Sequence, residues 1–311
     1  MLDIAKIYTT LLPDLEKADR VRQSGLNRTV PYKRFFFLCL TLFVALIVYI
    51  SFYGGSDGLS FITLLILIVG LMTYAIKRSL EANKFKEYFQ KEIAPGLINN
   101  LGPGFSYDPA GRFSKEILAG SKLFGYYNRY NSEDLVKGII DGKAVTFAEI
   151  LLEKVSESSS RSRRSTIFRG VFLSIELGST FPSPFWIVPK TNKLNVYYPR
   201  LKDVEGEIVE IDHPEFQNTF LIYSTNTQLT QALLKKNFMD SFIALNDNLK
   251  NKKIIAMDMQ FAFVNNTILV AMPAKLKFME SRLSEPVNTK DFIEKQLLFL
   301  DGVYRVGKII G

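Results

Sequence analysis

The sequence predicts an α+β fold: a two-span transmembrane helical hairpin followed by a cytoplasmic domain with a mainly antiparallel sheet and flanking helices. Two uncharged apolar segments, residues 35–53 and 59–76, predict the two spans. Farther along, extended segments flank two turn dipeptides, Asp-Gly at 141–142 and Asn-Asn at 265–266. Strands joined in hairpins, rather than alternating regularly with helices, favour an antiparallel sheet.

Residues 1–34 predict a cytoplasmic amphipathic helix that precedes the first span. Apolar side chains recur at helical spacing between residues 4 and 18, with basic side chains interleaved, and Pro13 does not outweigh this pattern. Such a helix can lie on an anionic leaflet or pack against the rest of the protein. Its acidic side chains dilute the positive face that surface binding needs, so packing is the favoured alternative.

Residues 35–76 predict the membrane hairpin. Each uncharged segment is long enough to cross a hydrocarbon core at about 1.5 Å per residue. The connection, residues 54–58, is rich in glycine and too short for anything except a tight reversal. A buried hairpin of a soluble protein is the alternative, and the unbroken apolarity around both helices disfavours it. No ionisable side chain interrupts either span, which favours an anchor over an ion or proton pathway.

Basic residues on both sides of the hairpin predict its orientation. Lys33 and Arg34 precede the first span, Lys77 and Arg78 follow the second, and the connection carries only Asp57. Both termini are therefore expected on the cytoplasmic side. The large C-terminal part then lies in a reducing compartment, in agreement with its lack of cysteine.

The remainder of the chain predicts a linker and one domain. Residues 77–105 predict a juxtamembrane helix, ending near Pro95 and Gly96, and a linker whose Gly-Pro-Gly at 102–104 marks a domain boundary. Residues 106–311 predict the cytoplasmic α+β domain. We expect its helices over 113–124, 227–249 and 291–304, and its strands around 141–142, over 166–177, 185–189 and 219–225, and in a second hairpin over 254–272.

A basic stretch supplies the candidate contact residues. Residues 156–165 are rich in serine and arginine and predict a polar loop. The candidates for contact with an anionic surface or an acidic partner are Arg161, Arg163, Arg164 and Arg169. A solvated hairpin tip is the structural alternative, and the two interpretations stay open. Nucleic acid is not expected, because the stretch lacks interleaved aromatic side chains for base stacking.

The sequence offers little material for catalysis. One histidine and one cysteine cannot build a Cys/His zinc site or a disulfide. No phosphate-binding loop, dinucleotide fingerprint, nucleophile elbow or metalloprotease motif occurs in the chain. His213 lies in a turn-like context, and the acidic residues of 205–212 are more simply the solvated side of a strand or loop. We therefore predict no catalytic, cofactor-binding or metal-binding residues and no cofactor, and lean against an enzyme.

The order of these features resembles a family of uncharacterised bacterial membrane proteins, domain of unknown function 3137. Two phrases carry the resemblance: Ile167-Phe168-Arg169-Gly170-Val171-Phe172, and a longer one from Phe216 through Phe220-Leu221-Ile222-Tyr223-Ser224 to Asn237-Phe238-Met239 and Leu245. The resemblance extends over residues 6–278. Lys235 and Lys236 depart from the expected Thr-Pro pair, so the start of the helix there is open. The resemblance implies a multi-pass protein of the bacterial inner membrane and no known activity.

Three functions remain open. The first is a membrane-anchored cytoplasmic interaction or scaffold module, the second a lipid-binding or lipid-sensing domain at the inner leaflet, and the third a membrane-bound enzyme without a recognisable motif. The expected partners are the lipid bilayer, through residues 35–76, and either anionic lipid headgroups or an unknown protein partner. An oligomer is compatible with the sequence, which sets no number of subunits.

The orientation can be tested with reporter fusions. Alkaline phosphatase, which is active only after export, should be active when inserted in residues 54–58 and inactive at the C-terminus. A fluorescent protein that folds only in the cytoplasm serves as the control and should give the reverse pattern. Alkaline phosphatase activity at the C-terminus would contradict the predicted topology.

Overall fold

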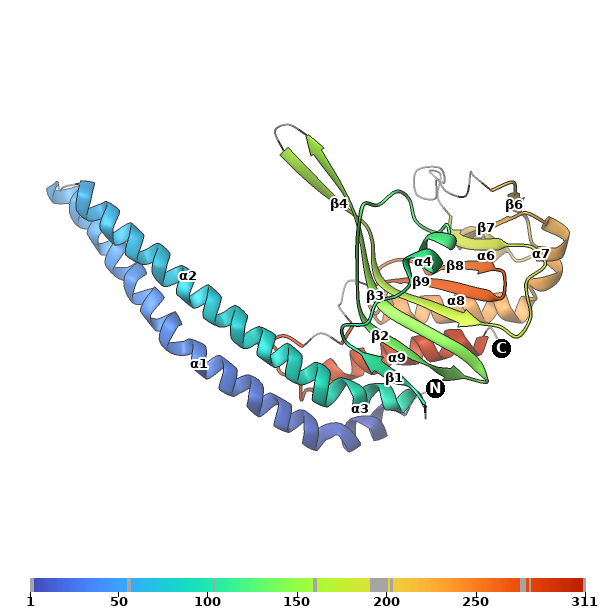
Figure 1. Ribbon diagram of the computed structural model, residues 1–311, viewed down its shortest axis with the longest axis horizontal. Helices are drawn as coiled ribbons and strands as arrows, with labels where there is room; N and C mark the ends of the chain where they lie inside the picture. Colours follow the sequence, from blue (N-terminus) through green and yellow to red (C-terminus); the bar gives the residue numbers. More distant parts are fainter. Residues whose placement is uncertain are drawn as a thin grey trace. The chain divides into compact units, whose positions relative to one another are not determined.

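A computed structural model describes residues 3–54, 57–102, 104–158, 161–190, 201, 204–274, 278–279 and 281–309 (Figure 1). The chain divides into two compact units. The helical unit comprises Tyr8–Ile93 and Glu280–Ile293, and the α+β unit comprises Met1–Ile7, Ala94–Met279 and Glu294–Gly311. The mixed α+β fold class is confirmed. The four segments predicted from the sequence, with boundaries at residues 34, 76 and 105, stay a prediction.

Two long antiparallel helices dominate the helical unit. α1 runs over Ile4–Tyr53 as one helix that contains Pro13 and Pro31, and α2 runs over Asp57–Tyr88. Arg28 Nη1 lies 3.2 Å from Glu81 Oε2, and farther along the Phe36 and Tyr74 rings stack at 6.4 Å. Because one residue number rises as the other falls, these contacts define the antiparallel register of a hairpin.

The chain continues as helix beyond the residues expected to end it. A π-helical turn, η1 (Phe89–Ile93), is followed by α3 (Ala94–Ile98) and a 3₁₀ turn, η2 (Asn99–Leu101). The sequence predicts an end near Pro95 and Gly96, and the structure corrects this. Pro95 falls in the first turn of α3, after the change in hydrogen-bond pattern, where the missing N–H of proline is least costly.

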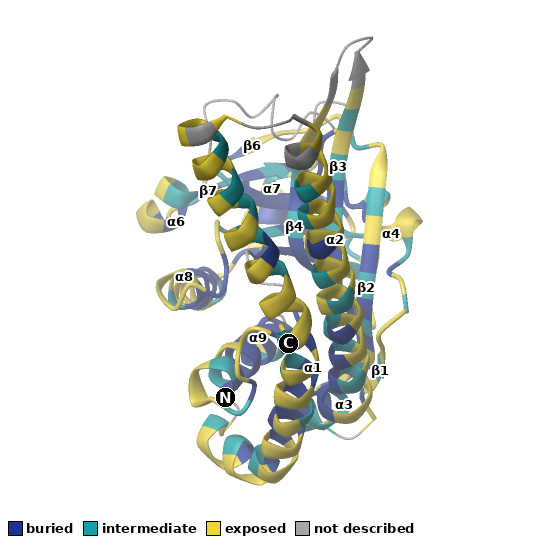
Figure 2. Cartoon of the chain, turned by 90° about the vertical axis from the view of Figure 1, so that its left-hand side faces the viewer, coloured by how far each residue is buried: buried dark blue, intermediate teal, exposed yellow. Residues whose placement is uncertain are grey.

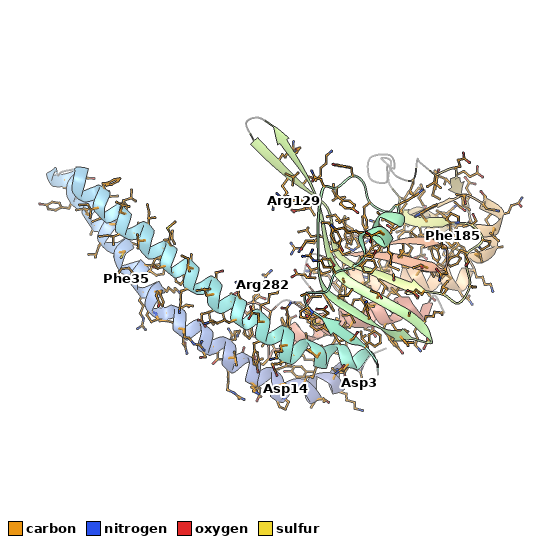
Figure 3. The ribbon with its side chains drawn as sticks, viewed as in Figure 1. Asp3, Asp14, Phe35, Arg129, Phe185 and Arg282 are labelled. Carbon is orange, nitrogen blue, oxygen red and sulfur yellow. The ribbon has the colours of Figure 1, made fainter. Side chains whose placement is uncertain are left out.

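Much of the apolar surface of α1 and α2 is unburied. Figure 2 shows both helices largely in the colour of exposed residues, and Figure 3 shows their side chains directed outward, with Phe35 labelled. Leu42, Phe52 and Phe61 expose 60%, 81% and 64% of their surface. Both helices are long and apolar enough to cross a membrane. Core helices of soluble proteins can match that length and composition, but they are mostly buried, whereas these apolar stretches are not.

A buried ion pair joins the second segment of the helical unit to α1. Asp19 Oδ1 lies 2.6 Å from Arg22 Nε and accepts a hydrogen bond from the Val287 N–H at 3.3 Å, and Arg22 Nη1 donates to the Leu283 carbonyl at 3.2 Å. Burial raises the pKa of Asp19, but hydrogen bonds from Arg22 and Gln23 outweigh it, so the pKa lies below its ordinary value. Asp19 is therefore held as a carboxylate that fixes residues 283–287 against α1.

In the α+β unit, nine strands within the described residues form one sheet in the order β1-β2-β3-β4-β9-β8-β5-β7-β6. Every neighbouring pair is antiparallel, as the hairpin signals predict. The strands are β1 (Ser106–Asp108), β2 (Arg129–Ile140), β3 (Lys143–Ser158), β4 (Arg161–Glu176), β5 (Phe185–Pro189), β6 (Glu207–Val209), β7 (Phe220–Ser224), β8 (Gln260–Val264) and β9 (Thr267–Pro273).

Both hairpins predicted from turn dipeptides are confirmed. Asp141 and Gly142 join β2 to β3 with φ angles of +48° and +76°. Asn265, with φ of +55°, lies in the turn from β8 to β9. These left-handed conformations suit the twist of two-residue hairpin turns, and Gly, Asn and Asp tolerate them best.

Helices cover one face of the sheet. α8 (Lys236–Asn251) packs on it through Phe242, whose ring lies 4.6 Å from that of Phe261 in β8. α9 (Lys290–Ile309) follows the same face, because a Cβ at Gly302 would lie 3.1 Å from Leu249 of α8 and 3.5 Å from Met272 of β9. The small residue at 302 therefore permits the close approach of α9.

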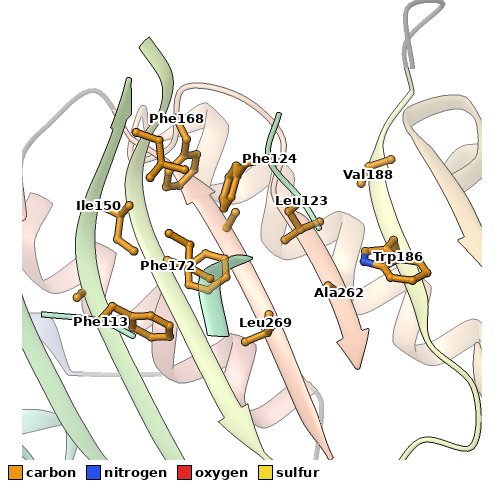
Figure 4. Packing of buried hydrophobic residues seen from close by; sticks show 14 of the residues in the cluster. Phe113, Leu123, Phe124, Ile150, Phe168, Phe172, Trp186, Val188, Ala262 and Leu269 are labelled. Atoms are coloured by element: carbon orange, nitrogen blue, oxygen red, sulfur yellow. The ribbon is translucent and has the colours of Figure 1, made fainter. Parts of the chain in front are cut away.

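The segment that contains the short helix α4 (Lys115–Gly120) covers the opposite face. Figure 4 shows Phe124 of this segment against Phe168 and Phe172 of β4, with Trp186 of β5 farther along the same face. The Phe124 and Phe168 rings lie 4.7 Å apart, and Trp186 Nε1 donates to the Ser121 carbonyl at 2.8 Å. Both faces of the sheet thus carry a buried core.

Three helices differ from the predicted bounds. The helix expected over 227–249 is two helices, α7 (Thr227–Leu233) and α8, because Leu234 turns into the core at 6% exposure and Lys235 is extended at ψ 150°. The helix expected over 113–124 shortens to α4, since Ser114 caps its start and the chain then turns at Ser121. The closing helix is longer than 291–304 and forms α9.

The Asp19 ion pair predicts a local loss of order in an Asp19→Asn variant. The change leaves the buried Arg22 guanidinium uncompensated, a type of loss that costs about 3 kcal/mol. Amide hydrogen exchange of residues 283–287 in the detergent-solubilised full chain should accelerate about 100-fold. Because the pKa of Asp19 is lower in the folded protein than in the unfolded chain, its contribution to stability is complete above the unfolded-state pKa. This contribution is lost as the pH falls through the folded-state pKa.

The exposed Asp14 on the same helix provides the matched control. Asp14→Asn should leave exchange in residues 283–287 unchanged. Equal exchange in wild type and the Asp19→Asn variant at neutral pH would contradict the role of the ion pair.

Candidate functional site

The segment expected to be a polar loop, residues 156–165, forms the ends of two paired strands instead. β3 and β4 stay in antiparallel register as far as Ser158 opposite Arg161, and residues 159–160, which join them, lie outside the described residues. The pairing begins in the apolar parts of both strands, and each further residue extends the backbone ladder whatever its side chain. The serine and arginine composition therefore does not produce a loop.

The paired strand ends extend beyond the rest of the sheet (Figure 1). We call residues 153–158 of β3 and 161–166 of β4 the arm. β2 accompanies β3 only to the pair Arg129 and Glu153, and β9 pairs with β4 only from Gly170. Arg129, labelled in Figure 3, thus marks the base of the arm.

One side chain continues the ladder a step past the end of β2. Asn128 Nδ2 donates to the Val155 carbonyl at 2.7 Å, and Asn128 Oδ1 accepts from the Val155 N–H at 2.8 Å. The amide side chain satisfies both backbone groups of Val155, as a strand partner would. Beyond it, in the described residues, the outer backbone edges of the arm are open.

The register separates the candidate arginines onto two faces. A bulge between Leu152 and Glu153 shifts the pairing, so Arg163 lies opposite Ser156 and Arg164 opposite Val155. Because side chains alternate across a strand, Arg163 and Arg164 lie on opposite faces. Arg161 falls on the face of Arg163, and its side chain lies outside the described part of the structure; Arg169, opposite Leu151, falls on the face of Arg164.

The surroundings of the arginines also differ. Arg163 and Arg164 are exposed, whereas Arg169 is half-buried within the sheet. Arg164 Nε lies 3.7 Å from Glu153 Oε1, and 58% of its side chain remains exposed. The structure therefore brings Arg163 and Arg164 to the arm and leaves Arg169 apart from them. Their role as contact residues stays a prediction.

The sequence did not single out two residues at the arm, Lys154 and Tyr126. Lys154 shares the face of Arg163, since it lies opposite Ser165, and its Nζ lies 5.9 Å from the centre of the exposed Tyr126 ring. A cation over an aromatic face is electrostatically favourable. The register of β3 against β4 was the missing information, because residue 154 is far from residue 163 in a loop and close to it in a hairpin.

His213 is a capping residue rather than a simple turn residue. It is the N-cap of α6 (Pro214–Thr219), and its Nδ1 accepts the Phe216 N–H at 3.2 Å. Since a backbone N–H only donates, Nδ1 acts as the acceptor, which leaves Nε2 to donate to Asp240 Oδ1 at 2.8 Å. The imidazole is 7% exposed and both nitrogens are occupied, an arrangement that stabilises α6 against α8.

The acidic residues between 205 and 212 lie at or beside the short edge strand β6. Glu205, Glu207, Glu210 and Asp212 are all exposed, and Glu207 Oε1 accepts a hydrogen bond from Thr227 Oγ1 at 2.7 Å. In the part of the chain that the structure describes, no three His, Cys, Asp or Glu side chains gather as metal ligands would. This stretch of the chain therefore supplies exposed edge residues.

A family model matches part of the chain. Residues 166–309 match the family described as "Protein of unknown function (DUF3137)". This match confirms the resemblance carried by the phrases around residues 167–172 and 216–245. It begins within β4 and includes α7, α8, β8, β9 and α9.

Other comparisons add little. No curated protein matches the chain. Among solved structures, the crystal structure of the mycobacterial trehalose monomycolate transport factor A, TtfA, is similar over 64% of this chain and 86% of that one, with 14% identity and a TM-score of 0.33. A likeness at this score supports no conclusion about fold or function.

The His213 cap predicts how substitutions change stability. His213→Ala removes the acceptor for the Phe216 N–H and should lower the free energy of unfolding by about 1–2 kcal/mol. His213→Asn, which keeps an acceptor at the same distance along the side chain, should restore most of that loss. Urea unfolding of the full chain in detergent micelles can be followed by the fluorescence of Trp186, the only tryptophan.

Asp212→Ala, a change at the exposed neighbouring residue, is the control and should unfold like wild type. Equal stability of the wild type and His213→Ala, or equal loss in His213→Ala and His213→Asn, would contradict the capping role.

Proposed function

Because residues 166–309 match the model of a family of unknown function, DUF3137, we propose a function from the surfaces of the molecule itself. The protein is a membrane-anchored interaction module: the hairpin of residues 35–76 holds it in the bacterial inner membrane with both termini in the cytoplasm, and the α+β unit binds a partner through the arm. It acts by binding rather than by catalysis.

The exposed apolar surface of the paired helices carries this proposal. Large apolar side chains cover both helices in a continuous band, and exposure of such a band to water is unfavourable by about 25 cal/mol per Å². A bilayer removes this cost over the length that both helices share. No charged residue interrupts the band between residues 35 and 53, which suits an anchor.

Aromatic and basic side chains support an interface at the edge of the band. Lys33 Nζ lies 5.9 Å from the Phe37 ring centre, Lys77 Nζ lies 5.7 Å from that of Tyr32, and Arg78 Nη1 donates to the Tyr74 hydroxyl at 2.9 Å. Such basic and aromatic groups are typical of the headgroup region, and an excess of Lys and Arg is typical of its cytoplasmic side. They support the proposed orientation.

The shape of the arm favours a protein partner over a flat surface. A membrane touches one face of a two-stranded arm, so it meets Arg163 or Arg164 but not both. A partner with an acidic groove contacts both faces, and it also pairs with the open backbone edges. We therefore place an acidic protein groove first among the partners of the arm.

Contact with anionic lipid headgroups is the second candidate. It is favoured by the shared face of Lys154 and Arg163, which gathers cations on one side of the arm. Each basic side chain near an anionic leaflet contributes about 1 kcal/mol. The two candidates differ in the role of Arg164, which lies on the other face.

A photocrosslinking residue at Ser165, an exposed arm position, tests the proposal in the intact protein in its native membrane. We expect a specific protein adduct that both Arg163→Ala and Arg164→Ala reduce, each by about fivefold for a loss of about 1 kcal/mol. The same crosslinker at the exposed Lys137 of β2 is the control position and should give no adduct.

Lipid adducts at Ser165 that respond to Arg163→Ala and Lys154→Ala but not to Arg164→Ala would favour the headgroup candidate. Absence of any adduct specific to Ser165 would contradict an interaction through the arm.

A further inference from the structure

A groove separate from the arm lies between α8 and the C-terminal half of α9. Its volume is about 650 Å³, within the range of sites for small molecules. The segments that form it are the end of α7, the first half of α8 and the end of α9. Its lining residues are Leu233, Lys235, Asn237, Phe238, Ser241, Ala244, Tyr304, Arg305 and Lys308.

Among the described residues, the lining contains three basic side chains and no acidic one. Lys235 directly precedes α8, Arg305 and Lys308 belong to α9, and the three share one concave surface. Arg305 lies 4.0 Å from Asp301, and Lys308 lies 3.4 Å from Asp141, but neither carboxylate lines the groove. The charged side chains that line the groove within the described part of the chain are therefore all basic, which favours an anionic ligand.

The remaining lining residues divide into polar and apolar groups. Asn237, Ser241 and Tyr304 provide an amide and two hydroxyls that can donate hydrogen bonds to an anion. Leu233 is a leucine with 40% of its surface exposed, and Phe238 is partly exposed beside it on the next helix. The groove therefore offers apolar side chains as well as cationic ones.

This combination specifies the chemistry of a ligand. A carboxylate offers two acceptor oxygens, fewer than the three cationic side chains that line the groove. A phosphate monoester brings nearly two charges and three acceptor oxygens. An apolar group attached to the phosphate would cover Leu233 and Phe238 and remove them from water.

We infer that the groove binds a phosphorylated ligand with an attached apolar group, held by Lys235, Arg305 and Lys308 at the phosphate and by Leu233 and Phe238 at the apolar part. Two kinds of molecule carry both groups: a lipid with a phosphate headgroup and a free organic phosphate. The inference does not depend on the proposed function, because arm and groove share no residue.

Calorimetric titration of the full chain in nanodiscs of neutral phosphatidylcholine, in a phosphate-free buffer, tests this inference. The probes are inorganic phosphate, hexyl phosphate and dihexanoyl phosphatidic acid. We expect hexyl phosphate to bind at least tenfold more tightly than inorganic phosphate, since only it has an apolar group. Tighter binding of the phosphatidic acid assigns a lipid source, and equal binding assigns a free organic phosphate.

Matched variants identify the site. Lys235→Gln and Lys308→Gln should each weaken hexyl phosphate binding about tenfold, whereas Lys236→Gln, at the adjacent residue outside the lining, should leave it unchanged. Leu233→Ser changes an exposed side chain and should weaken hexyl phosphate but not inorganic phosphate. Arg163→Ala should have no effect, which keeps this test separate from that of the arm.

Three results would overturn the inference. They are no binding of any probe, equal binding of inorganic phosphate and hexyl phosphate, and a loss in Lys236→Gln as large as that in Lys235→Gln.

Discussion

The antiparallel pairing of β3 with β4 is the interaction on which the α+β unit depends. These two strands lie inside the sheet, with β1 and β2 on one side and the other five strands on the other. Gly170 is the point where β4 acquires its second neighbour, and a Cβ there would lie 2.1 Å from the Met272 carbonyl oxygen. With φ of +155° as well, the position accepts only glycine, so the junction of β4 with β9 requires this residue.

The same pairing determines what the arm presents. Below the bulge, between Leu152 and Glu153, the register places Phe168 and Leu152 together in the core. Above it, the register places Arg163 with Ser156 and distributes the arginines over both faces. One irregularity in the ladder thus separates a strand segment with an apolar face from a segment that is charged on both faces. The arm can be a solvated extension of the sheet because it carries no apolar face to bury.

Local signals in the sequence were sufficient for some elements and insufficient for others. The turns at 141–142 and 265–266 were predictable because they depend on the φ angles of the residues themselves. The strands of the arm were not predictable from local signals. Serine and arginine favour loops, and the ladder extends through them only because the adjoining apolar strand segments pair. The break between α7 and α8 also depends on tertiary structure, since Leu234 leaves the helical pattern to enter the core.

The candidate site shows the same limit more strongly. The arginines were identifiable as charges, but their division between two faces required the register of β3 against β4. The capping role of His213 was detectable in principle from Pro214, a residue favoured in the first turn of a helix. The groove had no local signal, because residues 233–244 and 304–308 meet only after α8 and α9 have packed on the sheet.

Among the 39 lysine and arginine residues, three sets lie in different environments. Lys33 and Lys77 lie over aromatic rings beside the apolar band, and Arg78 donates to the Tyr74 hydroxyl. Arg163 and Arg164 are exposed to water on the arm. Their attraction to an anionic partner acts over a long range and is weakened by salt. Lys235 and Lys308 are exposed and Arg305 is half-buried, and the three line one concave surface, where a bound anion is attracted to all of them. A bound anion that covers Lys235 and Lys308 would shield these charges from salt, so a change in ionic strength should weaken contacts of the arm more than binding in the groove.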